Sequence, residues 1–272
     1  MSEKKKFIDI KRVLEEKNPK LKKWLPGFMV RYLQKILHEK EVNEFIESQN
    51  DSDSFEFCQA VIKKFNIELN AFGIENVPDE GGCVLAVNHP LGGMDAMALV
   101  TLLEHKRKDI KFIVNDILLN LDSLKGMFVG VNKHGKNAKD SLKKVDELFA
   151  TDQLICLFPA GLVSRKKNGK VRDLEWKKTF VTRSRKHDKP IIPVHINGEL
   201  SNFFYRLSNI RGKVGIKANI EMLYLVNELY KQNNKKMNVV FGNPIDSRSL
   251  DKSKTDLQWA TEIKEKVYQL EK

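Results

Sequence analysis

The chain has 272 residues, of which 41% are hydrophobic and 31% are charged, and this composition indicates a globular protein with one sizeable core. Lys and Arg outnumber Asp and Glu by 48 to 36, and the resulting net charge of +12 favours anionic partners such as phosphate groups. No apolar run approaches the roughly 18 residues of a membrane-spanning helix, and no signal peptide is apparent, so we expect a cytoplasmic protein.

An amphipathic segment over residues 18–40 opens the chain. Apolar and aromatic side chains recur there every three or four residues with basic residues between them, and Pro26 interrupts the helix or restarts it. The segment is either a membrane-surface anchor or a helix packed on the main core, because periodicity alone does not show what its apolar face contacts. With a second helical stretch over 41–64, it predicts an N-terminal helical extension over residues 1–64.

Short apolar runs alternate with helical patterns from residue 65 to residue 272. We expect strands over 67–74, 83–88, 111–114, 128–132, 154–158, 191–196 and 238–241. We expect helices over 95–106, 138–150, 174–187, 217–230 and 254–270. This alternation predicts an α/β domain with a mixed, mostly parallel sheet flanked by helices. Functional residues of such sheets lie beyond the carboxyl ends of the strands, and His89 and Pro159 follow two of them.

The stretch AVNHPLGGMDAM, residues 86–97, contains a histidine and an acid six positions apart. On one helix His89 and Asp95 would lie far from a common face, so they meet only if the Pro-containing, glycine-rich loop folds back. Asp95 would then fix the tautomer of the imidazole and leave its second nitrogen as a general base. The alternative is an ordinary turn in which Asp95 merely caps the following helix.

Positive charge is concentrated between residues 164 and 189, a stretch that contains eleven Lys and Arg residues but only three acidic residues. Such a cluster binds anionic groups or forms a solvated helix face. The three cysteines, in contrast, are far apart and form no C-x-x-C pair, so we expect neither disulfides nor a zinc site, but buried thiols.

Two motifs resemble those of the glycerolipid acyltransferases, the 1-acylglycerol-3-phosphate acyltransferase family. NHPLGGMD resembles the first motif, Asn-His, four residues, Asp, except that the aspartate comes one residue late. FPAGLVSRKK resembles the third motif, Phe-Pro-Glu-Gly-Thr followed by Ser and a basic residue, with Ala160 in place of the glutamate and Leu162 in place of the threonine. PIIPVHI, at 190–196, resembles the fourth motif. The second motif falls near MFVGVNKHGK, where Lys133 is a basic candidate.

The resemblance covers about residues 67 to 245 and implies transfer of a fatty acyl group from acyl-CoA or acyl carrier protein to a hydroxyl of a lipid. The acceptor would be a lysophospholipid or, as in divergent bacterial aminolipid-type (PlsC-like) members, an acylated amino-acid lipid. Because Ala160 supplies no carboxylate, a glycerol 3-phosphate derivative is not assumed. The resemblance implies catalytic roles for His89 and Asp95. It implies substrate binding by Asn88, Lys133, Phe158, Pro159, Gly161, Ser164, Arg165 and Lys166.

The expected reaction, part of membrane lipid biosynthesis, needs no metal and no cofactor besides the acyl thioester co-substrate. We expect the protein to work peripherally on the inner face of the membrane and to bind no nucleic acid. A different class is a non-catalytic basic protein that binds anionic lipid or nucleic acid on a degenerate acyltransferase scaffold. A covalent serine mechanism is disfavoured because G-x-S-x-G does not occur, and the spacing of His195 and Glu199 indicates no metal site.

Overall fold

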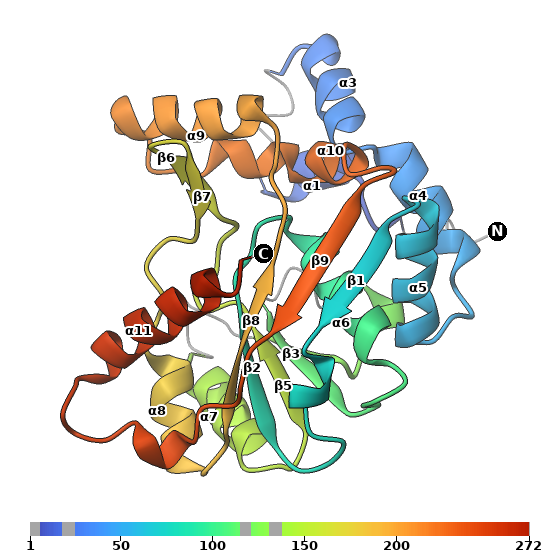
Figure 1. The fold of residues 1–272 in the computed structure, drawn as a ribbon. Helices are drawn as coiled ribbons and strands as arrows, with labels where there is room; N and C mark the ends of the chain where they lie inside the picture. Colours follow the sequence, from blue (N-terminus) through green and yellow to red (C-terminus); the bar gives the residue numbers. More distant parts are fainter. Residues whose placement is uncertain (1–5, 18–24, 115–120, 131–137, 272) are drawn as a thin grey trace. The chain divides into compact units, whose positions relative to one another are not determined.

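The computed structural model describes residues 6–17, 25–114, 121–130 and 138–271, and it divides the chain into two compact units (Figure 1). The first unit comprises Met1–Ser52 and Ser201–Lys231, and the second comprises Asp53–Leu200 and Gln232–Lys272. This division differs from the predicted boundary after residue 64. Helix α5 (Ser54–Lys64) belongs to the second unit because it packs against α6 (Gly93–Leu103).

The first unit is helical. The elements described in it are α1 (Ile10–Lys17), α3 (Gly27–Ile36), α4 (Glu39–Ser48), α9 (Asn202–Lys213), the 3-10 helix η4 (Ile220–Tyr224) and α10 (Leu225–Tyr230). As Pro26 predicted, a helix restarts at Gly27, while residues 18–24 of the predicted amphipathic segment lie outside the described part of the chain. Helix α3 buries Ile36 but exposes Phe28, Met29 and Tyr32.

The second unit contains a seven-stranded sheet in the order β1-β9-β8-β2-β5-β3-β4. All neighbouring pairs are parallel except β8 and β9, so the predicted mixed, mostly parallel sheet is confirmed. The strands are β1 (Glu68–Phe72), β2 (Cys83–Val87), β3 (Ile110–Val114), β4 (Phe128–Gly130), β5 (Leu154–Leu157), β8 (Ile191–Ile196) and β9 (Lys236–Phe241).

Helices cover both faces of this sheet, as expected for parallel strands that read as continuous apolar runs. On one face, Val84 and Ile155 pack in a core with side chains of α7 (Ala138–Phe149), α8 (Thr179–Lys186) and α11 (Asp256–Gln269). Helices α5 and α6 lie on the other side of the sheet (Figure 1). Every residue of β2 is fully buried, so alternate residues of this central strand are covered on each face. The described part of this unit also contains the short 3-10 helices η1 (Ile74–Asn76), η3 (Asp122–Leu124) and η5 (Ser247–Ser249).

Two predicted elements differ from the structure. The expected helix over 174–187 begins only at Thr179, and the basic residues before it form a small antiparallel hairpin, β6 (Arg165–Lys167) and β7 (Lys170–Arg172). Asn168 and Gly169 turn the hairpin with φ of 50° and 76°, the backbone that an Asn-Gly pair adopts readily. The expected helix over 217–230 is instead η4 followed by the short α10.

The three cysteines are buried, as predicted, and this makes their thiols unreactive. Cys58, Cys83 and Cys156 are at most 1% exposed. Burial raises the pKa of Cys58 to about 12 and that of Cys83 to about 11, and it raises the pKa of Cys156 as well. Because the thiolate is the reactive form, we expect the native protein to leave Ellman's reagent unchanged at pH 8 and the urea-unfolded protein to release one equivalent per cysteine. Rapid reaction of the folded protein would contradict this burial.

Candidate active site

The predicted histidine, His89, follows the carboxyl end of β2. The loop after it folds back, as the predicted contact between His89 and Asp95 requires. Gly92, with φ of 72°, precedes the first residue of α6, and Asp95 lies in the first turn of that helix. His89 Nδ1 lies 2.8 Å from Asp95 Oδ2, and the Leu91 N–H donates to the same oxygen at 3.0 Å. The flexible glycine pair thus accommodates the extra residue between the two side chains.

This pair has the geometry of an oriented imidazole. Asp95 is fully buried, whereas the His89 side chain is 18% exposed. Burial raises the pKa of Asp95, and the hydrogen bonds from His89 and Leu91 act in the opposite direction. With the carboxylate accepting from Nδ1, the lone pair of the imidazole lies on Nε2, for which the described residues provide no hydrogen-bond partner. The accessible nitrogen is therefore the one that could accept a proton.

Phe158 fixes the imidazole ring by stacking on it. The two ring centroids are 4.0 Å apart and the ring planes differ by 20°. The contact arises because β2 and β5 are parallel neighbours, with Ala86 opposite Leu157, so the residues after both strands meet at one edge of the sheet. The two resemblance motifs, about 70 residues apart in sequence, are in contact through these rings.

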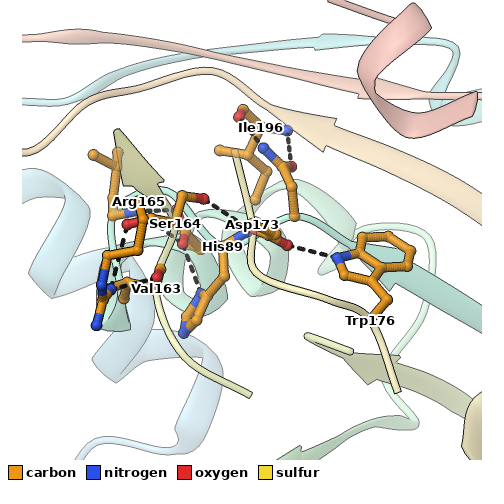
Figure 2. A network of polar contacts seen from close by, with 10 residues as sticks. His89, Val163, Ser164, Arg165, Asp173, Trp176 and Ile196 are labelled. Carbon is orange, nitrogen blue, oxygen red and sulfur yellow. Dashed lines mark hydrogen bonds and ion pairs between the residues drawn. The ribbon is translucent and has the colours of Figure 1, made fainter. Parts of the chain in front are cut away.

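Asp173, which sequence reasoning did not select, links the two motifs (Figure 2). Its Oδ1 accepts the His89 backbone N–H at 3.1 Å and the Ser164 hydroxyl at 2.5 Å, and its Oδ2 accepts Trp176 Nε1–H at 2.8 Å. The Ser164 N–H in turn donates to the His89 carbonyl at 2.8 Å. Asp173 is only 5% exposed, so this carboxylate replaces its lost hydration with three donors.

The hairpin β6–β7 explains why Ser164 and Asp173 meet. The two residues lie just outside the register in which Arg165 faces Arg172, at the open end of the hairpin. The Asp173 N–H donates to the Tyr268 hydroxyl at 2.7 Å, and Lys264 Nζ donates to the Asp173 carbonyl at 2.7 Å. Helix α11 therefore holds Asp173 from the other side. The Asn-Gly turn was the one sequence signal that could have revealed this closure.

Asn88 joins β2 to β8 and does not point freely into the site. Its side-chain amide donates to the Ile196 carbonyl at 2.8 Å and accepts the Ile196 N–H at 2.7 Å. With 2% exposure, it works as a structural link beyond the last strand pair. In this structure the Asn88 amide therefore positions the end of β2 against β8, and its predicted contact with substrate stays a prediction.

The other predicted substrate-binding residues surround the turn after β5. Gly161 has φ of 68° and donates its N–H to the Phe158 carbonyl at 2.9 Å, while the Pro159 carbonyl accepts the Lys177 N–H at 3.1 Å. Arg165 is buried and its Nη1 donates to the Val163 carbonyl at 2.5 Å. Lys166 forms a 2.9 Å ion pair with Glu199. Lys133 lies outside the described residues.

A small cavity of about 100 Å³ adjoins the loop between β2 and α6. Leu91 and Met94, from or next to that loop, line it together with Glu199 and Gln232. Whole small-molecule sites typically enclose about 300–1,000 Å³, so this cavity has room for only part of a ligand.

His195, the other histidine of the sheet, is buried beside Tyr268, and burial lowers its pKa, which fits the structural role expected for it.

Comparisons with known proteins show which family the chain resembles. A family model described as Acyltransferase matches residues 12–272. The chain belongs to this family. The acyltransferase is 44% identical over 265 residues to a Lyso-glycine lipid O-acyltransferase of Bacteroides thetaiotaomicron, covering 97% of each chain. It is 41% identical to a protein of the same name from Phocaeicola vulgatus, covering 97% of this chain and 95% of that one.

The same fold occurs in a crystal structure of the 1-acyl-sn-glycerophosphate acyltransferase PlsC from Thermotoga maritima. The match has a TM-score of 0.50 and covers 88% of the acyltransferase and 95% of PlsC, at 17% sequence identity. At this identity the likeness concerns the fold alone. Together with the family match, it confirms the predicted PlsC-like resemblance and the prediction of an acyltransferase enzyme.

Proposed function

We propose that the acyltransferase moves a fatty acyl group from acyl-CoA or acyl carrier protein to the free hydroxyl of a lyso-glycine lipid. The observation that carries this function is the His89–Asp95 pair, with Nε2 available, at the carboxyl edge of the sheet. The acceptor is supported by two relatives with that printed activity, each matched over almost its entire length. Ala160, where the resembling motif has a glutamate, also favours an amino-acid lipid over a glycerophosphate.

In the proposed mechanism His89 acts as general base. Its Nε2 takes the proton of the acceptor hydroxyl while the oxygen attacks the thioester carbonyl carbon. The imidazolium that forms is stabilised by the buried Asp95 carboxylate 2.8 Å from Nδ1. Collapse of the tetrahedral intermediate breaks the carbon–sulfur bond, and His89 returns the proton to the leaving thiolate. Ester and thiol are the products, and the imidazole is restored without a metal or a further cofactor.

We assign the anionic groups of the substrates to the basic residues after β5. Lys166 and Arg165 follow directly on the turn that carries Phe158, and they begin the stretch with eleven basic residues against three acids. A glycine headgroup presents a carboxylate, which Lys and Arg bind through charge-assisted hydrogen bonds. The exposed Lys167, Lys170 and Lys178 of this stretch suit either donor, because CoA carries phosphates and acyl carrier proteins are typically acidic.

The enzyme would work in the cytoplasm, peripherally bound to the inner face of the membrane. Within the described residues no helix is long and apolar enough to cross a bilayer. A lipid acceptor supports surface binding, as do the exposed Phe28, Met29 and Tyr32 of α3, which lie among basic residues of the predicted amphipathic segment.

An acceptor panel tests this function. The purified enzyme is given acyl-CoA or acyl carrier protein thioester together with lyso-glycine lipid, a lyso-ornithine lipid or 1-acylglycerol 3-phosphate, and released thiol and ester product are measured. We expect lyso-glycine lipid to give the highest kcat/KM, because its acylation needs only the hydroxyl and the carboxylate contact. Exclusive acylation of 1-acylglycerol 3-phosphate would contradict the proposed acceptor. Absence of thiol release with every pair would instead favour a non-catalytic binding protein.

A further inference from the structure

Helix α9 (Asn202–Lys213) carries its apolar side chains on the outside. Phe203, Ile210 and Val214, the C-cap residue, are 48%, 59% and 69% exposed, and Leu207 between them is half-buried. Their spacing of four, three and four residues places all four on one side of the helix. We call these four residues the α9 stripe. A helix of a soluble protein normally turns such a stripe toward the core, so its exposure needs a partner.

The opposite side of α9 already fastens the helix to the first unit. Phe204, Tyr205 and Ser208 are buried there. Glu228, itself fully buried, accepts the N–H and the hydroxyl of Ser201, the N-cap residue of α9, at 2.5 and 2.7 Å. A buried ion pair of 2.8 Å joins Arg211 to Glu221. The helix is therefore fixed with the stripe facing outward, and no other described part of its own unit covers it.

The α9 stripe is continuous with the exposed face of α3. The Phe203 and Tyr224 rings pack edge to face with centroids 4.9 Å apart, and the Tyr224 hydroxyl lies 2.8 Å from the hydroxyl of Tyr32 on α3. Of the exposed large apolar side chains among the described residues, only Phe72, Leu142 and Leu257 belong to the second unit. Most of the exposed large apolar side chains among the described residues therefore belong to the first unit, although this unit contains less than a third of the chain.

We propose that the α9 stripe is a membrane-docking surface that inserts at the headgroup level of an anionic bilayer. Arg206, Lys213 and Lys217 are exposed beside the stripe, and the sequence has no acid between residues 201 and 219. Aromatic and aliphatic side chains next to Lys and Arg match the boundary between acyl chains and anionic headgroups. The inference rests on the proposed lipid substrate and adds a second membrane contact, on a helix that begins 166 residues after the end of α3, to the N-terminal one.

Vesicle sedimentation with the full-length protein tests the proposal. The vesicles contain phosphatidylglycerol and phosphatidylcholine in equal parts, and the variant carries Ile210→Ser and Val214→Ser, which remove apolar area without changing the charge. We expect its partition coefficient to fall about tenfold or more, since each aliphatic side chain would lose its burial in the bilayer. The matched control carries Leu142→Ser and Leu257→Ser, two exposed leucines of the second unit, and should bind like the wild type.

The vesicle result and two further measurements, sedimentation velocity and activity in micelles, distinguish the alternatives. Equal binding of the stripe variant and the wild type, or an equal loss in the control, would overturn the proposal. So would sedimentation velocity that shows a lipid-free dimer converted to a monomer by the stripe variant, because the face would then join two copies. Activity on lyso-glycine lipid in detergent micelles should be unchanged in the stripe variant. If the wild type shows no activity in the micelle assay but the stripe variant still loses vesicle binding, the membrane-docking proposal is supported and only the proposed function is contradicted.

Discussion

The His89→Ala variant should lose acyl transfer by about 10²- to 10⁴-fold in kcat, the usual contribution of a positioned general base. An acceptor hydroxyl attacks a thioester poorly unless its proton is removed as the bond forms, and Nε2 of His89 is the nitrogen left available by the Asp95 contact. Thiol release from acyl-CoA measures the effect under saturating acceptor. The folded state should persist, because the side chain lies at the rim of the site and is 18% exposed.

Two companion variants make this result specific. Asp95→Asn should lower kcat strongly while leaving KM for the acceptor nearly unchanged, because an amide orients the ring but favours the wrong tautomer. His105→Ala, which removes an exposed histidine, should match the wild type. If His89→Ala retained more than about a tenth of the wild-type rate, far above the residual activity expected without a general base, another residue would have to act as the base.

Replacing Asp173 with asparagine should destabilise the fold and impair catalysis together. The carboxylate accepts three hydrogen bonds in a buried position, and an amide can present only one oxygen, so its NH₂ group would face a donor. Each buried donor left without an acceptor costs about 1–3 kcal/mol, and we expect the free energy of unfolding to fall by about 2–4 kcal/mol. Urea unfolding followed by tryptophan fluorescence measures it.

The catalytic part of this prediction follows from the His89 backbone. Its N–H donates to Asp173, so a disturbed carboxylate loosens the loop that presents the imidazole, and kcat should fall even at temperatures where the variant is fully folded. Glu175→Gln is the matched control, since it makes the same change at an exposed acid two residues away. Ser164→Ala should show a smaller loss of stability, because it removes only one of the three donors. Equal stability of Asp173→Asn and wild type would contradict the role of this network.

The sheet, and the position of the candidate site at its carboxyl edge, could be predicted from the sequence because both depend on local patterns. Buried parallel strands are continuous apolar runs, and the residues after them occupy a common edge by topology. His89 and Phe158 were therefore predictable as neighbours. The closing of the loop that brings Asp95 to the imidazole was inferred from Pro90 and the glycine pair, and the structure has that loop.

The elements that sequence reasoning missed depend on contacts between distant segments. Asp173 is one acid within a basic stretch, and nothing local distinguishes it from a solvated residue until the hairpin brings it against Ser164 and His89. Helix α9 was not predicted because a helix is recognised in sequence by one apolar face and one polar face. In α9, apolar residues lie both on the exposed side and on the buried side, so neither face is purely polar. The grouping of residues 201–231 with the N-terminal helices was likewise not predicted, since these segments meet only in three dimensions.

The burial of all three native sulfhydryl groups makes this enzyme convenient for spectroscopic labelling. A cysteine introduced at an exposed position, for instance Lys170→Cys near the tip of the β6–β7 hairpin, would be the only thiol that maleimide dyes modify in the folded protein. A fluorophore there would sit on the strand pair that ends at Asp173. Labelling at this position would need no prior removal of the native cysteines.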